Sequence, residues 1–105
     1  MIGFRPTDAG RYGSARFGRA HTRYQCALLL RATVGDAYDR GAGGVVDVRA
    51  LTERMLKNYA NHDADPPDDD EALACELLDE LSPEGFSWGW DREGNFGMWR
   101  LTPAT

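Results

Sequence analysis

Two aromatic-rich runs near the end of the chain constrain its fold more than any other feature. The first, residues 86–90, reads Phe-Ser-Trp-Gly-Trp, and the second, residues 96–101, reads Phe-Gly-Met-Trp-Arg-Leu. Aromatic residues favour strands, and the five residues between the runs include a glycine that can adopt a positive φ. The pattern therefore predicts a two-stranded β-hairpin over residues 86–101.

Apolar residues at helical spacing predict a first helix over residues 22–40, ended by the glycines at 41–44. Its inward positions are Cys26, Leu29, Leu30, Thr33, Val34 and Ala37. Ala27, Leu28 and Ala32 widen the apolar face. We therefore expect this helix to be buried on most of its sides.

A second helix is predicted over residues 48–60, after a short extended piece at Val45 and Val46. Asp47 is a good N-cap for it, because a carboxylate can accept from the first free backbone N–H groups. Its expected inward stripe is Val48, Leu51, Met55, Leu56 and Tyr59. A loop should follow, ended by the two prolines at 66 and 67.

The third predicted helix covers residues 69–81. Asp68 is its expected N-cap, and Glu71 stands three residues later, as in a capping box. Its inward positions are Leu73, Ala74, Leu77, Leu78 and Leu81. We expect seven residues from the three helices to be buried together, with the helix of residues 22–40 as the central one: Leu29, Leu30, Leu51, Met55, Leu77, Leu78 and Leu81.

Residues 1–21 should form a basic arm outside the domain of residues 22–105. Its glycines interrupt every regular period, and its arginines alternate with aromatic residues. Basic aromatic segments of this kind bind nucleic acids by phosphate contacts and stacking. The alternative is that the aromatics pack on the domain and leave the arginines solvated.

The order of three helices and a hairpin resembles a winged helix-turn-helix domain over residues 22–102. The most similar part is the junction Leu77-Leu78-Asp79-Glu80-Leu81-Ser82-Pro83-Glu84-Gly85-Phe86, where a helix ends in a polar turn and an apolar residue opens the wing. The resemblance implies an α+β fold and a third helix that reads DNA in the major groove.

Length and composition indicate how many domains the chain forms and in which compartment we expect it. At 105 residues with 42% hydrophobic content, the chain suits one folded domain. No apolar run approaches the 18 residues of a membrane span, and no hydrophobic leader directs export, so we expect a cytoplasmic protein. Cys26 and Cys75 then fit buried thiols, with a disulfide as the alternative.

Charge is divided between the two halves of the chain. Residues 1–60 carry ten basic and five acidic residues, and residues 61–105 carry two basic and twelve acidic ones. The predicted third helix has no basic residue, so phosphates beside it would be repelled. Reading DNA through that helix, as the resemblance implies, therefore conflicts with its charge.

The leading hypothesis is an acidic, non-catalytic protein that binds a basic protein or nucleoprotein complex. Nine carboxylates, which we call the acidic row, would mimic the phosphates of a nucleic acid. They are Asp63, Asp65, Asp68, Asp69, Asp70, Glu71, Glu76, Asp79 and Glu80. The chain is similar in size and charge to small phage-encoded inhibitors, including anti-CRISPR proteins. Trp88, Trp90 and Trp99 would be apolar anchors if exposed. A solvated, solubilising face is the plain alternative.

The alternative function is a DNA-binding transcriptional regulator that uses the arm and the second helix. Its contacts would come from Arg11, Arg16, Arg19, Arg23, Arg49, Arg54 and Lys57. The acidic half would then face solvent or a second copy in a homodimer. No nucleophile–base pair and no recognised metal-ligand spacing stands out, so we predict no enzyme activity, no cofactor and no metal site.

Overall fold

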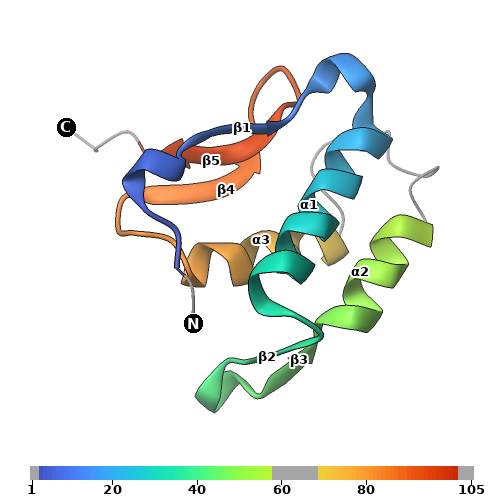
Figure 1. The fold of residues 1–105 in the computed structure, drawn as a ribbon, viewed down its shortest axis with the longest axis vertical. Helices are drawn as coiled ribbons and strands as arrows, with labels where there is room; N and C mark the ends of the chain where they lie inside the picture. The colour runs from blue at the N-terminus through green and yellow to red at the C-terminus, as the bar shows by residue number, and fades with distance from the viewer. Residues whose placement is uncertain (1–2, 58–68, 102–105) are drawn as a thin grey trace.

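The computed structural model of this chain, which describes residues 3–57 and 69–101, has an α+β fold (Figure 1). Within these ranges the helices are α1 (Arg19–Val34), α2 (Val48–Lys57) and α3 (Asp69–Glu80). α1 contacts both other helices, and α3 also packs against the sheet. The predicted α+β class and the order of three helices and a hairpin are confirmed, and the resemblance to a winged helix stays a prediction.

The main sheet has the order β1-β5-β4 and is antiparallel throughout. β4 (Phe86–Trp90) and β5 (Phe96–Arg100) form the predicted hairpin, with Trp88 opposite Met98. A Cβ at Gly97 would overlap the carbonyl oxygen of Gly10, so glycine is needed where β1 crosses β5. The sheet therefore includes a third strand that the sequence analysis did not predict.

That strand, β1 (Gly10–Gly13), comes from the segment expected to be a loose arm. Phe4 packs on Trp88 with ring centroids 4.8 Å apart, and its N–H donates to the carbonyl oxygen of Leu81 at 2.8 Å. The single turn η2 (Ala15–Phe17) then leads into α1. The expectation of an arm outside the core is wrong for these residues, because β1 pairs its backbone groups with β5 on the edge of the β4–β5 hairpin.

α1 ends earlier than predicted. Gly35 has a φ of +80° and donates its N–H to the carbonyl oxygen of Arg31, which ends the helix at Val34. The next residues form a separate antiparallel hairpin from β2 (Ala37–Asp39) and β3 (Val45–Asp47). The predicted extended piece at 45–46 is confirmed, whereas residues 35–40 are not helical.

The two later helices begin close to where they were predicted. The Asp47 carboxylate accepts from the N–H of Ala50 at 3.0 Å, which confirms it as the N-cap of α2. α3 begins at Asp69 as expected. Asp68, Tyr59 and the predicted loop of residues 58–67 lie outside the described residues.

The core lies where α1, α2, α3 and the β4–β5 hairpin meet. Of its predicted members Leu29 is partly buried and the other six are buried, and Trp88, Phe96 and Met98 join them from the sheet. Four expectations of burial are wrong: Leu28 is 43% exposed, Leu56 is 37% exposed, and Ala32 and Ala37 are exposed as well. α1 therefore buries one side and shows the other to solvent, because the described part of the fold has no layer over that side.

None of the helices in residues 3–57 and 69–101 combines the length and the hydropathy needed to cross a bilayer.

Candidate functional site

Two arginines of α1 meet one carboxylate of α3 inside the core. The Oε1 atom of Glu71 lies 2.9 Å from Nη2 of Arg19 and 3.4 Å from Nη1 of Arg23. Glu71 and Arg23 are each 1% exposed or less. Arg23 also donates from Nε to the carbonyl oxygen of Met55 at 2.6 Å, which brings α2 into the arrangement. We call Arg19, Arg23 and Glu71 the charged cluster.

Aromatic side chains continue this cluster toward the sheet. The guanidinium of Arg19 lies 4.1 Å from the centre of the Trp90 ring, a distance suited to a cation–π contact. The indole N–H of Trp90 donates to Oγ1 of Thr22 at 3.0 Å. Buried charges are costly unless paired and hydrogen-bonded, so these contacts make the cluster a structural joint between the helices and the sheet.

Other members of the acidic row also have partners inside the chain. Asp70 pairs with Arg54 at 3.2 Å, and Glu80 pairs with Arg40 at 2.6 Å. These pairs link the basic half of the sequence to its acidic half. Part of the charge asymmetry is thus neutralised within the fold.

Asp79 supports the sheet. Its carboxylate accepts from the N–H of Trp88 at 2.6 Å and from the hydroxyl of Ser87 at 3.1 Å. Burial raises the pKa of Asp79 above its usual value, and the bonds from Trp88 and Ser87 oppose that rise. This carboxylate therefore joins the end of α3 to β4.

The exposed remainder of the acidic row is small. Asp69 and Glu76 are exposed on α3. Asp63, Asp65 and Asp68 lie outside the described residues. Within residues 69–80, the structure does not bring the predicted carboxylates together as one open face.

The tryptophans proposed as anchors differ in their accessibility. Trp88 is 4% exposed and packs between Phe4 and Phe96. Trp90 is partly buried under Arg19, and Trp99 is partly buried and donates its indole N–H to the carbonyl oxygen of Gly89 at 3.0 Å. Trp88 is therefore part of the core, and Trp90 and Trp99 expose only part of their side chains to a partner.

The predicted basic contacts also divide into two groups. Arg19 and Arg23 belong to the charged cluster, and Arg49 and Arg54 pair with Glu53 and Asp70. The others, which form no ion pair among the described residues, are exposed: Arg11, Arg16 and Lys57. Because Arg23 has no exposed surface, it cannot contact DNA in this conformation.

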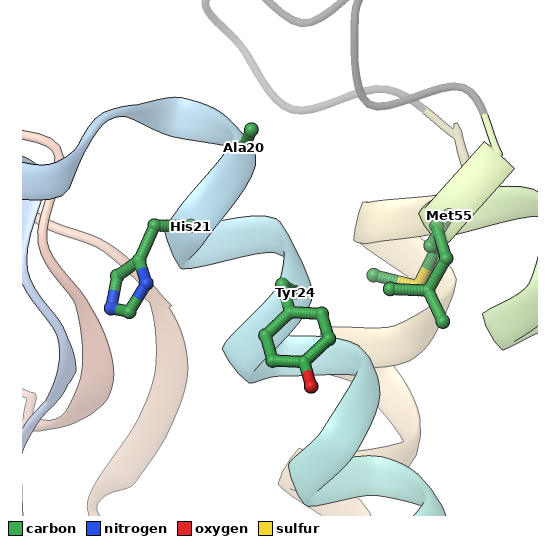
Figure 2. A pocket seen from close by; sticks show the side chains of 5 residues that line it. Ala20, His21, Tyr24 and Met55 are labelled. Carbon is green, nitrogen blue, oxygen red and sulfur yellow. The ribbon is translucent and has the colours of Figure 1, made fainter.

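A concave apolar surface lies between α1 and α2 (Figure 2). The described residues that line it are Ala20, His21 and Tyr24 of α1 and Met55 and Leu56 of α2, around a volume of about 430 Å³. We call it the α1–α2 groove. The groove was not predicted because Leu56 was expected in the core. The residues at positions 21, 24 and 28 form a second face of α1 that could have indicated it.

The two cysteines are free thiols on facing helices. Cys26 is fully buried and Cys75 is partly buried. Burial, with a hydrogen bond to Cys75, raises the pKa of the Cys26 thiol well above its usual value. A thiol that resists ionisation is a poor nucleophile and a poor metal ligand, and no group of side chains in the described ranges could hold a metal ion.

Comparisons with protein-family models, with curated proteins and with solved structures found no significant match to this chain.

Proposed function

We propose that this protein is a non-catalytic interaction protein whose acidic segment, residues 63–76, binds a basic surface of a protein or nucleoprotein complex. The supporting observation is the charge of residues 61–105, with twelve acidic and two basic residues. Long-range attraction between this segment and a basic surface would speed association and make it depend on salt. A complex that handles nucleic acid suits this role, because carboxylates can occupy positions meant for phosphates.

The contacts that α3 makes with the rest of the chain limit which of its carboxylates are free to bind a partner protein. Asp70, Glu71, Asp79 and Glu80 are engaged with partners inside the chain. Asp69 and Glu76 are exposed and form no ion pair among the described residues. These two are therefore the members of the acidic row on α3 that can be changed without disturbing the fold.

The experiment captures a partner from the native host with the tagged chain, purifies that partner, and measures its affinity by calorimetry at two salt concentrations. The test variant carries Asp69→Lys and Glu76→Lys. The matched control carries Glu84→Lys and Glu93→Lys, which make the same change in net charge at exposed positions outside the acidic row. Circular dichroism verifies that both variants keep their helices.

We expect the test variant to bind at least ~10-fold more weakly, about 1.4 kcal/mol, and the control to stay within about threefold. The weakening should grow as salt is lowered. Equal losses in both variants would mean that net charge alone matters. Retained affinity in the test variant would remove the acidic segment on α3 from the interface.

The alternative, a DNA-binding regulator, is favoured by the exposure of Arg11, Arg16 and Lys57. Gel-shift titration of duplex DNA at low salt tests it. Binding should weaken steeply with added salt and should fall when the three cations are changed to Gln. Arg23→Gln is unsuited to this test because it would disturb the core.

A further inference from the structure

An unpartnered apolar stripe runs along the exposed side of α1. His21, Tyr24 and Leu28 follow one another at spacings of three and four residues on α1, which places them on one face, and Phe17 of η2 precedes them. Phe17 is 65% exposed, Tyr24 is 46% exposed and Leu28 is 43% exposed. The rings of Phe17 and His21 meet edge to face at 5.1 Å. Large exposed side chains gathered in this way mark an interaction surface.

The α1–α2 groove lies beside this stripe and shares His21 and Tyr24 with it (Figure 2). Leu56 forms the opposite wall and also lines a second hollow of about 320 Å³ with Glu53 and Lys57. The stripe and the two hollows therefore make one surface with an apolar centre. An apolar hollow between two helices is the kind of surface into which a third helix can lay its apolar side.

The charges around this surface have one dominant sign. α1 has no acidic residue, and two of its three arginines, Arg19 and Arg23, are engaged by Glu71. Arg31 is engaged by Asp36, and Glu53 is engaged by Arg49. Exposed cations without an ion-pair partner among the described residues remain at the end where α1 begins and α2 ends: Arg16, next to Phe17, and Lys57, next to Leu56. Such a rim attracts carboxylates.

These observations discriminate among occupants. A second copy would bring the same cationic rim against itself, which opposes self-association. Nucleic acid would gain from Arg16 and Lys57, but only His21 and Tyr24 among the described lining residues could hydrogen-bond a base edge. The other three, Ala20, Met55 and Leu56, offer only apolar contact. An acidic peptide with apolar side chains on one face matches both the centre and the rim.

We propose that the α1–α2 groove docks an acidic amphipathic helix of a partner protein. Apolar side chains at i, i+3 or i+4, and i+7 of that helix would occupy the groove and cover Tyr24 and Leu56. Its carboxylates would lie near Arg16 and Lys57. None of the described residues that line this surface belongs to the acidic segment, so the proposal stands whether or not that segment binds a basic partner.

The test is a phage-displayed library of 16-residue peptides selected against the intact protein. The apolar positions of one helix face are kept, and the other positions vary among Glu, Lys, Gln and Ala. Counter-selection uses the Leu56→Glu variant. We expect the peptides that survive to be enriched in Glu over Lys.

Fluorescence anisotropy of the most enriched peptide then compares variants. Leu56→Glu and Tyr24→Glu should each weaken binding by ~10-fold or more, with Leu56→Ala as a milder change at the same position. Val45→Glu is the matched control, since Val45 is 68% exposed on the β2–β3 hairpin. Its affinity should stay within about twofold. Arg16→Gln with Lys57→Gln should weaken binding mainly at low salt.

Failure to enrich any peptide that depends on Leu56 would overturn the proposal, as would enrichment of Lys over Glu. Two further results would replace it. Displacement of the peptide by a labelled dT20 oligonucleotide would assign the surface to nucleic acid. A wild-type dimer in sedimentation, dissociated by Leu56→Glu, would assign it to a second copy.

Discussion

α3 and the outer side of α1 carry surfaces of opposite character, and each differs from what its sequence indicates. α3 has six acidic residues in twelve positions, yet four of them have partners inside the chain. α1 has apolar residues on nearly every side, yet Tyr24 and Leu28 are exposed. A charged helix can be committed to its own fold, and an apolar one can be available for binding.

The difference arises from the pairing of the two halves of the chain. Arginines at 19, 23, 40 and 54 lie in the basic half, and each contacts a carboxylate of α3. Opposite charges close together in a partly buried setting attract more strongly than they would in water. α3 is therefore held by its charges as well as by its leucines, whereas the outer side of α1 has no such neighbour among the described residues.

The largest effect should come from the charged cluster. Glu71→Ala removes the buried carboxylate that Arg19 and Arg23 contact, so the free energy of unfolding should fall by ~3–5 kcal/mol. Asp69→Ala, two residues earlier but exposed, should change it by less than about 0.5 kcal/mol. Urea denaturation followed by circular dichroism measures both. Similar small losses would mean that the cluster is solvated in solution.

Substitution of one leucine on each helix tests whether α3 is buried where the outer side of α1 is exposed. Leu77→Ala on α3 removes a fully buried side chain and should cost ~2–5 kcal/mol. Leu28→Ala on α1 removes one that is 43% exposed and should cost less than about 1 kcal/mol. The same denaturation series gives both values. A large loss at Leu28 would show that the outer side of α1 is covered in solution.

Asp79 should have an intermediate effect. Asp79→Ala removes the acceptor for Ser87 and Trp88 and should cost ~1–3 kcal/mol. Because burial raises the pKa of Asp79, the folded state binds its proton more tightly than the unfolded state does. The stability of the wild type relative to Asp79→Asn should therefore rise as the pH falls from above the folded pKa toward the ordinary value of 3.8. An unchanged difference between pH 7 and pH 3.5 would contradict this.

The smallest effect should come from the pair of Arg40 and Glu80. Their side chains are 27% and 34% exposed, so water and salt screen their attraction. Removing the pair with Arg40→Ala should cost at most ~1 kcal/mol, and less at high salt. A double-mutant cycle with Glu80→Ala measures the coupling. A coupling energy above about 2 kcal/mol would mean that this pair contributes to stability as a buried pair does, like the charged cluster.

Local sequence patterns were sufficient for much of the fold. The helical periodicity of residues 69–80, the capping residue Asp47 and the aromatic hairpin of residues 86–100 all formed as predicted. These features depend on neighbours within a few positions. Gly35 is a local signal too, but the longer run of apolar residues led to a prediction that extended α1 beyond it.

The candidate sites could be predicted only in part. The exposed residues Asp69, Glu76, Arg11 and Arg16 could be named from charge alone. The engagement of Glu71 by Arg19 and Arg23 joins positions about fifty residues apart, and a single sequence does not indicate which charges meet. The α1–α2 groove needed the crossing of two helices, which periodicity does not specify.

Local residue patterns were thus enough to predict three helices, the C-terminal hairpin, most of the core and the division of charge between the halves. The three-dimensional arrangement was needed to show that β1 completes the sheet, that α3 engages four of its six carboxylates inside the chain, and that Tyr24, Leu28 and Leu56 remain on the surface. The difference follows from the distance along the chain over which each interaction acts. Periodicity and capping act over one or two turns, whereas burial and ion pairing depend on which distant segment arrives to cover each face.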